Sequence, residues 1–212
     1  IDLHRQTAAW DPEIPRYDDA RMLAEAALLV DWYMPAITGR ETPPALREGF
    51  LALWQSLLPV ARRVPETLVL RDYHVDNLMR LSGRGGIAGC GLLDFQGAVI
   101  GPVTYDLVSL LEDARRDIAP SLGAAMLKRY RKAFPALDEQ AFAASYAVLG
   151  AQRNAKIIGI FTRLSRRDGK PRYLAHIPRV WRLLESDLRH PSLSAMREWF
   201  DRHIPPSQRT VS

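Results

Sequence analysis

The chain has 212 residues, of which 47% are hydrophobic and 25% are charged, with a formal net charge of +5 and a pI of about 9.6. This composition is typical of an ordinary globular protein. The single cysteine, Cys90, excludes an internal disulfide. No apolar run approaches the ~18 residues of a membrane span. We therefore expect a cytoplasmic protein that does not enter a membrane, and its positive charge suits an anionic ligand such as a nucleotide.

Two helices are predicted ahead of the first β segment. A helix over 18–34 can begin at an Asp18 or Asp19 cap, and Pro35 and Gly39 are expected to end it. A second helix over 43–58 starts at a Thr-Pro pair, a good cap and first position, and Pro59 is expected to stop it. Both ranges carry apolar residues at helical spacing, so each helix should bury one face.

A β insert is predicted over 67–95. The apolar stretch 67–70 indicates a buried strand, and 78–81 and 87–93 indicate two more. The last two flank 82–86, Ser-Gly-Arg-Gly-Gly, which is a strong turn signal. We therefore expect an antiparallel hairpin there.

The rest of the chain has a helical pattern. The predicted helices cover 104–117, 120–134, 138–164, 171–189 and 191–203. The tail 205–212 is expected to be disordered. The outline is an α+β, mostly helical fold, with one domain over 1–204.

Three polar residues stand around the predicted hairpin. Asp72 follows the first strand, Asn77 comes five positions later, and Asp94 ends the last apolar run. Asn77 and Asp94 are equidistant from the Gly-rich turn, so pairing would place their Cα atoms roughly 4.5–5.5 Å apart. An amide oxygen and a carboxylate at that spacing can share a hard cation such as Mg²⁺. The structural alternative is that these residues only cap turns.

These residues resemble the protein-kinase-like superfamily, and within it the aminoglycoside phosphotransferase group. The shared pattern is His-x-Asp, an Asn five residues after that Asp, and Asp-Phe or Asp-Trp after a hairpin. Asp72, Asn77 and Asp94 match it. The resemblance implies a protein-kinase-like C-terminal lobe in which the hairpin carries the active site. Asp72 would be the catalytic base, and Asn77 and Asp94 would bind Mg²⁺ on the phosphates of ATP.

Two further positions bear on the resemblance. The segment 101–107, Gly-Pro-Val-Thr-Tyr-Asp-Leu, resembles the family's Pro-x-x-Tyr-Asp-Leu segment. By resemblance, Asp106 braces the catalytic loop. Leu70 departs from the pattern, because the family usually has His there, and this puts the rigidity of the loop in doubt more than the chemistry.

Longer stretches are similar to bacterial cell-wall amino-sugar kinases, which phosphorylate N-acetylmuramate or N-acetylglucosamine. The stretches are 71–73, 93–96, 101–111 and 152–161. The resemblance implies transfer of the γ-phosphoryl group of ATP to a hydroxyl of an amino sugar. An aminoglycoside or another small molecule is the alternative acceptor.

The family's N-terminal lobe has no counterpart here. No Gly-rich loop followed by a strand Lys precedes Asp72, and the chain begins with Ile1 instead of Met, without a signal pattern. We expect a processed or partial chain that holds the catalytic lobe alone, partners with the missing lobe of the same protein, and is inactive in isolation.

Other candidate site residues lie near this motif or on the long helix. Arg71 is expected to support the loop or to meet an acidic partner. His74 is expected to bond within the loop, with contact to substrate or phosphate as the alternative. Arg153 and Asn154 lie on a helix that by resemblance lines the sugar pocket, and a solvated or core-edge role is equally open.

Some charged and thiol side chains are expected to have no such role. Glu25, Asp31, Glu112 and Asp113 could bind a cationic amino sugar, but they are interpreted as surface charges. Cys90 is interpreted as a small core residue on a strand.

Two functions of other classes compete with the kinase interpretation. A phosphate-backbone binder would have a basic C-terminal half, as this chain does in Arg153, Lys156, Arg163, Arg166, Arg167, Lys170, Arg172, Arg179, Arg182 and Arg189. No recognition motif or interleaved aromatic residue accompanies this charge, so we expect no nucleic-acid partner. A pseudokinase scaffold is suggested by Leu70 and the missing lobe. The intact Asp72, Asn77 and Asp94 argue against it.

Overall fold

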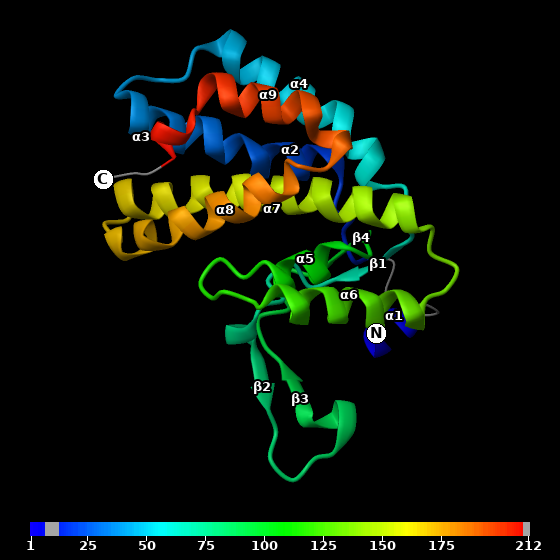
Figure 1. Cartoon of the computed structure of the whole chain (residues 1–212). Helices are drawn as coiled ribbons and strands as arrows, with labels where there is room; N and C mark the ends of the chain where they lie inside the picture. Colours follow the sequence, from blue (N-terminus) through cyan, green and yellow to red (C-terminus); the bar gives the residue numbers. More distant parts are fainter. Residues whose placement is uncertain (7–12, 210–212) are drawn as a thin grey trace.

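The computed structural model describes residues 1–6 and 13–209, and they form a mostly helical α+β fold. The helices are α1 (Asp2–Arg5), α2 (Asp19–Leu28), α3 (Met34–Thr38), α4 (Pro44–Ala61), α5 (Tyr105–Leu111), α6 (Pro120–Ala133), α7 (Glu139–Arg166), α8 (Ile177–Asp187) and α9 (Ser194–His203). Helix α7 is the centre of the fold and packs against α2, α4, α5 and α8. Figure 1 shows α2, α4 and α9 on one side of α7, and α5, α6 and the strands on the other.

The first predicted helix is longer than the sequence suggested. The Asp18 side chain accepts a hydrogen bond from the Arg21 N–H and caps α2 as predicted. A π-helical turn, Leu29–Tyr33, then joins α2 to α3. Of the two predicted stops, Pro35 does not end the helix, because the change of hydrogen-bond register at the π turn accommodates a residue that lacks an N–H. Gly39, the other predicted stop, ends it with a φ of 71°.

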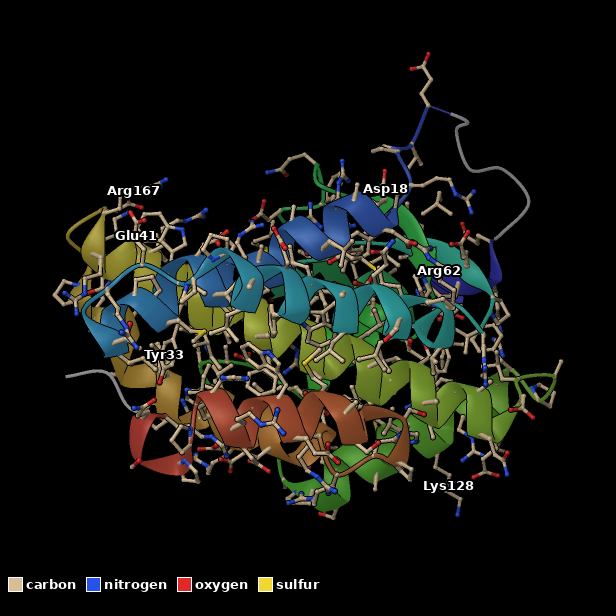
Figure 2. The ribbon with its side chains drawn as sticks, turned by 90° about the horizontal axis from the view of Figure 1, so that it is seen from above. Asp18, Tyr33, Glu41, Arg62, Lys128 and Arg167 are labelled. Carbon is tan, nitrogen blue, oxygen red and sulfur yellow. The ribbon has the colours of Figure 1, made fainter. Side chains whose placement is uncertain are left out.

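Helix α4 also continues past its predicted end. Pro59 lies inside its last turn, and the helix runs to Ala61. Arg62 follows, and its guanidinium donates to the Tyr17 carbonyl at 2.7 Å and to Asp19. Figure 2 shows Asp18 and Arg62 toward the same end of the molecule. The end of α4 is thereby tied to the start of α2.

The strands form two antiparallel pairs. β1 (Glu66–Val69) pairs with β4 (Val99–Pro102), and β2 (Leu78–Arg80) pairs with β3 (Cys90–Leu92). The β2–β3 hairpin was predicted and projects away from the helices in Figure 1. β4 was not predicted, because its Gly-Pro ending reads as a turn. A Cβ at Gly101 would lie 3.1 Å from the Tyr17 Cβ, so a glycine lets the two segments pack closely.

The C-terminal helices match their predicted positions better than their predicted lengths. Helices α6 and α7 lie where 120–134 and 138–164 were predicted. The helix predicted over 104–117 ends at Leu111, because the Asp113 side chain accepts the Arg115 N–H and starts a turn. The ranges 171–189 and 191–203 each begin with a 3₁₀ turn, as Pro171–His176 and Pro191–Leu193.

The predicted disordered tail is partly ordered. Pro206–Gln208 forms a 3₁₀ turn. The Arg209 guanidinium is buried, where it donates to the Ile204 carbonyl and forms ion pairs with Glu185 and Asp201. Residues 210–212 lie outside the described residues.

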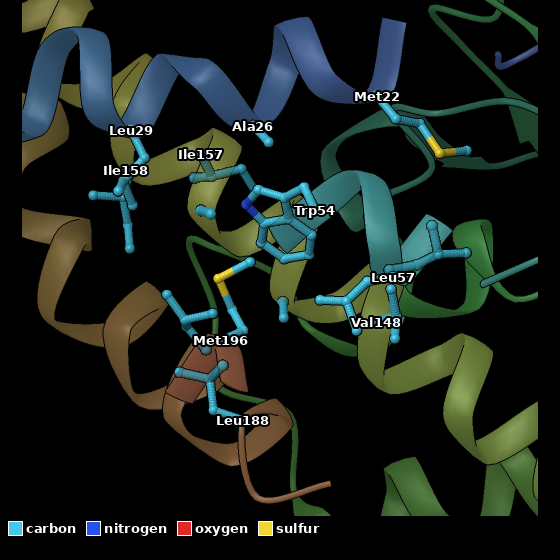
Figure 3. Close-up of a cluster of buried hydrophobic side chains, with 14 of the residues drawn as sticks. Met22, Ala26, Leu29, Trp54, Leu57, Val148, Ile157, Ile158, Leu188 and Met196 are labelled. Atoms are coloured by element: carbon cyan, nitrogen blue, oxygen red, sulfur yellow. The ribbon is translucent and has the colours of Figure 1, made fainter. Parts of the chain in front are cut away.

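The core is built around α7 and its neighbours. Figure 3 shows Trp54 and Leu57 of α4 beside Val148 of α7 and Met196 of α9. Gly159 allows α7 to cross α2 closely, since a Cβ at Gly159 would lie 2.3 Å from the Leu28 backbone. No helix in the described ranges combines the length and apolar character needed to span a bilayer.

Candidate active site

The 70–77 loop leaves β1 with an unusual backbone. Leu70 is buried, whereas Asp72 is exposed. Between them, Arg71 has a φ of 66°, in the left-handed region that non-glycine residues seldom adopt. The left-handed residue turns the chain sharply, and the next side chain, Asp72, reaches solvent.

The buried Asp106 side chain stabilises this turn through hydrogen bonds to its backbone. Its carboxylate accepts the Leu70 N–H at 2.7 Å with one oxygen and the Arg71 N–H at 3.0 Å with the other. The Ser109 hydroxyl donates to the Arg71 carbonyl at 3.0 Å. Burial raises the pKa of the Asp106 carboxyl to about 6, against the backbone hydrogen bonds, which lower it. These are the contacts that a bracing role at Asp106 requires.

Asn77 closes the loop on Asp72. It ends a 3₁₀ turn, Val75–Asn77, and its side-chain N–H donates to the Asp72 carbonyl at 2.9 Å. The same nitrogen lies 3.4 Å from the His74 Nε2. These bonds orient the planar amide so that its oxygen lies on the side away from the Asp72 carbonyl. The oxygen is the atom of the amide that can bind a cation.

The hairpin register differs from the prediction by one residue. Leu78 pairs with Leu92, and the Leu93 N–H donates to the Asn77 carbonyl at 2.9 Å. Asn77 therefore faces Leu93, and Asp94 lies one residue further along. The expectation that Asn77 and Asp94 form a cross-strand pair was wrong, because an irregular 82–89 loop with a 3₁₀ turn replaces a symmetric hairpin turn.

The backbone at Asp94 departs from that of a regular strand. In a regular strand, alternation would direct Asp94 to the face opposite Asn77. Asp94 has a φ of 55°, which breaks that alternation directly after the hairpin. Its side chain is exposed, and one carboxylate oxygen accepts the Gln96 side-chain N–H at 2.7 Å.

The donor set around the loop suits a cation shared with a ligand. Within the described ranges, no group of three or more His, Cys, Asp or Glu side chains is placed to hold a metal. Asn77 and Asp94 supply one amide and one carboxylate, which are hard oxygen donors. Mg²⁺ is commonly held by one or two carboxylates together with substrate phosphates and water. The residues present fit such an ion and do not form a closed protein cage.

His74 lies at the buried side of the loop. Its Nδ1 is buried and has no hydrogen-bond partner in the described part of the chain. Burial lowers the pKa of His74, and the charge of Arg115 lowers it further, against Asp113, which raises it. A largely neutral His74 is compatible with either a loop role or a substrate contact.

Arg153 and Asn154 are both buried on α7. The Arg153 guanidinium lies 3.5 Å from the Glu112 carbonyl. The Asn154 side-chain N–H donates to Glu112 at 2.8 Å and to Asp187 at 3.0 Å. Asn154 therefore bridges two interior carboxyl groups, and neither residue has the solvated role that was left open.

Several predicted surface residues are interior ones. Glu112 and Asp113 are buried, and only Asp31 is exposed as expected, in an ion pair with Arg47. Burial raises the pKa of both Glu112 and Asp187. Their burial beside Asn154 has no sequence signal, because it depends on how α5, α7 and α8 meet. The core position predicted for Cys90 was also wrong, since its side chain is exposed on the projecting hairpin.

Glu25 is the main site-linked residue that the sequence did not reveal. Its side chain is 12% exposed, pairs with Arg71 and lies 3.0 Å from Lys156. The Tyr17 hydroxyl donates to the same carboxylate. The sequence gives no warning, because Glu25 precedes the 70–77 loop by two helices.

The basic C-terminal half does not form one free positive surface. Arg153 is buried, Lys156 pairs with Glu25, and Arg167 pairs with Asp168. Arg179 and Arg182 both pair with Asp117. Much of the charge that suggested a phosphate-backbone binder is thus neutralised within the fold.

Comparison with known proteins places this loop in a family. The family model described as "Phosphotransferase enzyme family" matches residues 1–142, which include the 70–77 loop, Asp94 and Asp106. The chain belongs to the phosphotransferase enzyme family. The resemblance seen in the sequence is thereby confirmed.

Curated members of the family support a narrower group. The chain is 40% identical over 91% of its length to an N-acetylmuramate/N-acetylglucosamine kinase of Caulobacter vibrioides, of which it covers 53%. It is 36% identical over 92% of its length to the enzyme of the same name from Pseudomonas putida, of which it covers 58%. The chain therefore spans little more than half the length of these relatives.

A solved structure supports the fold. A choline/ethanolamine kinase family protein from Mesorhizobium loti matches 93% of this chain and 61% of its own, with a TM-score of 0.58. The sequence identity is 14%, so this likeness concerns the fold alone.

Proposed function

We propose that this chain is the C-terminal catalytic lobe of a cytoplasmic kinase that transfers the γ-phosphoryl group of ATP to a hydroxyl of an amino sugar. The observation that carries the proposal is the closed 70–77 loop. In it, the Asn77 amide is bonded to the Asp72 backbone, and the Asp72 carboxylate is left exposed. The family match and the names of the relatives support a phosphoryl-transfer role for this loop.

Asp72 is the proposed catalytic residue. Its carboxylate would orient the acceptor hydroxyl and take its proton as the hydroxyl oxygen bonds to the γ-phosphorus. The bond between that phosphorus and the oxygen bridging to the β-phosphate breaks in the same step, and ADP leaves. Because the transition state is loose, most of the acceleration would come from positioning and charge neutralisation.

Asn77 and Asp94 are the proposed metal-binding residues. The amide oxygen of Asn77 and the carboxylate of Asp94 would hold Mg²⁺ against the nucleotide phosphates. Bound there, Mg²⁺ would neutralise charge that develops on the phosphoryl oxygens. Asp106 would keep the 70–77 loop in register with these two ligands through its hydrogen bonds to Leu70 and Arg71.

The acceptor is proposed from the relatives. Their printed names give N-acetylmuramate and N-acetylglucosamine as substrates. In both sugars the nitrogen is acetylated and carries no positive charge, so the site needs a general base for the hydroxyl more than a pocket that binds a cation. An exposed carboxylate on a fixed loop meets that need.

The region of the protein outside this chain would cover the site. Exposed large hydrophobic side chains gather on the hairpin and just after it, at Met79, Ile87, Leu93 and Phe95. Ile87 is 68% exposed and Phe95 is 57% exposed. The relatives are nearly twice as long, and we propose that their additional lobe packs here and clamps ATP. The isolated chain would then be inactive.

The test uses the full-length protein and compares two aspartates of one loop. Asp72→Ala is expected to lower kcat by roughly 10²–10⁴-fold with little change in the KM for ATP. Asp76→Ala is the matched control, since Asp76 is exposed and forms its ion pair with Arg116, away from the proposed metal ligands. Near-normal kcat in Asp72→Ala would contradict the proposed function.

A further inference from the structure

Glu25 occupies a position where a charge is costly. It lies on α2, whose neighbouring side chains Met22, Ala26 and Leu29 are buried in the core. Burying a carboxylate there costs several kcal/mol unless cations and hydrogen bonds compensate. Such a buried ion group stabilises a fold no better than apolar residues of the same size would. Its presence therefore points to a positional role.

The partners of Glu25 lie on three separate elements. Arg71 comes from the 70–77 loop, Lys156 from α7 and Tyr17 from the segment before α2. Burial alone would raise the pKa of the Glu25 carboxyl, but Lys156, the Tyr17 hydroxyl and Arg71 together lower it. Glu25 is therefore a carboxylate at neutral pH and holds the Arg71 guanidinium by charge.

The Arg71 guanidinium reaches from one loop to the other. It lies over the Tyr17 ring, with its central carbon 5.7 Å from the ring centroid. One of its terminal nitrogens lies 3.7 Å from where a Cβ would stand at Gly97. Gly97 is three residues after Asp94, so the Arg71 side chain passes beside the loop that carries Asp94.

We propose that Glu25 is a positioning residue that fixes the backbone turn at Arg71, and with it the direction of Asp72, through the Arg71 guanidinium. The proposal rests on the proposed function, since it concerns the same catalytic aspartate. Asp106 and Ser109 hold the Arg71 backbone, and Glu25 holds its side chain, so the strained residue is restrained at both ends. Neither Glu25 nor Lys156 touches the reacting atoms.

The test is Glu25→Gln in the full-length protein, which keeps the shape and removes the charge. We expect kcat to fall on the order of tenfold, below the 10²-fold that a 1 Å misplacement can cost. KM for ATP should stay within about twofold, because binding groups are untouched. Glu66→Gln is the matched control. Like Glu25, Glu66 pairs with two cationic side chains, here Arg16 and Arg62, but it lies at the end of β1 away from the 70–77 loop. It should lower stability to a similar extent and leave kcat unchanged.

A double variant shows whether Glu25 acts through Arg71. If it does, Glu25→Gln combined with Arg71→Gln should be no slower than Arg71→Gln alone. Additive losses, or a kcat for Glu25→Gln within twofold of wild type, would overturn the proposal. Should Glu25→Gln not fold, Arg71→Lys tests the same link, because the compact ammonium of a lysine cannot keep both the ion pair with Glu25 and the place over the Tyr17 ring. A wild-type kcat there overturns the proposal as well.

Asp72→Ala is measured beside these variants to separate two failures. Loss of turnover in Asp72→Ala with normal turnover in Glu25→Gln rejects only the positioning role. Normal turnover in Asp72→Ala rejects the proposed function itself.

Discussion

The inner and outer sides of the 70–77 loop differ in burial and in bonding. On the inner side, Leu70 is buried and Asp106 accepts two backbone N–H groups. On the outer side, Asp72 and Asp94 are exposed, and Asp94 has one hydrogen bond, from Gln96. The side that would carry the chemistry makes few contacts with the rest of the chain, and the side away from it is firmly bonded.

This difference shows where precision in such a site comes from. A residue of such a site has to be held close to its productive geometry by the groups around it, and here that restraint acts mainly on the backbone. Two left-handed residues, Arg71 and Asp94, set the directions of the chain at the two aspartates. Such backbone conformations cost of order 1–3 kcal/mol each and persist only where surrounding contacts enforce them.

The outer side is also tested at Asp94, where we expect the largest effect after that of Asp72→Ala. In the full-length protein, Asp94→Ala should lower kcat by roughly 10²-fold and raise the Mg²⁺ concentration needed for half-maximal rate, because a metal supplies several kcal/mol of charge stabilisation. Titration of turnover with MgCl₂ measures both. Gln96→Ala is the control, since it removes only the hydrogen bond to Asp94 and should cost less than about tenfold. Equal effects of the two variants would show that Asp94 does not bind the metal.

The inner side is tested at Asp106. In Asp106→Asn one acceptor oxygen becomes an NH₂ group that faces a backbone N–H, so we expect a loss of about 1–3 kcal/mol in the free energy of unfolding. Turnover should fall with it, because the loop is no longer held. Ser109→Ala removes one weaker bond to the same loop and should cost about 0.5–1.5 kcal/mol. Denaturant titration measures both losses. An unchanged unfolding midpoint for Asp106→Asn would show that the Asp106 hydrogen bonds do not stabilise the loop.

The same carboxyl predicts a pH dependence. The folded-state pKa of Asp106 is raised to about 6. Proton binding to a carboxyl with a raised pKa adds to stability, so its contribution to the free energy of unfolding grows as pH falls from about 6 toward about 4. Turnover should fall over that window, because a protonated carboxyl cannot accept both N–H groups. The ratio of wild-type to Asp106→Asn kcat should therefore drop below pH 6, and a constant ratio would refute this assignment.

Two glycine variants test the packing of α7 against α2, which supports the inner side of the 70–77 loop. Gly159→Ala should destabilise the protein by about 1–3 kcal/mol, because its Cβ would overlap the Leu28 backbone. Gly123→Ala, on α6 with nothing within 4 Å, should stabilise it by roughly 0.5–1 kcal/mol. Thermal unfolding of both variants measures the contrast. Similar shifts in the same direction would mean that α7 does not approach α2 as closely as described.

Local sequence signals predicted those parts of the molecule that local chemistry determines. The Asp18 cap, the Gly-rich turn and the apolar run of α7 each depend on neighbouring residues, and all appear where expected. Asp72, Asn77 and Asp94 were found because their spacing is local too. Their roles in catalysis and metal binding remain predictions.

The features that were missed depend on distant contacts. The hairpin register depends on how the 82–89 loop folds, and one residue of difference exchanges Asp94 for Leu93 opposite Asn77. Glu25 and Glu112 were assigned to the surface because a lone charge gives no sign of its partners. Their burial follows from the way α2, α5 and α7 meet around Lys156 and Asn154.

The proposed function is tested most directly by the product that the full-length protein forms from ATP and an amino sugar. Mass spectrometry of reactions with N-acetylglucosamine and N-acetylmuramate should show a sugar monophosphate and ADP in equal amounts. The phosphosugar should be absent from the Asp72→Ala reaction. Formation of the phosphosugar by Asp72→Ala at the wild-type rate, or no phosphosugar from either acceptor with the wild-type protein, would contradict the proposed function.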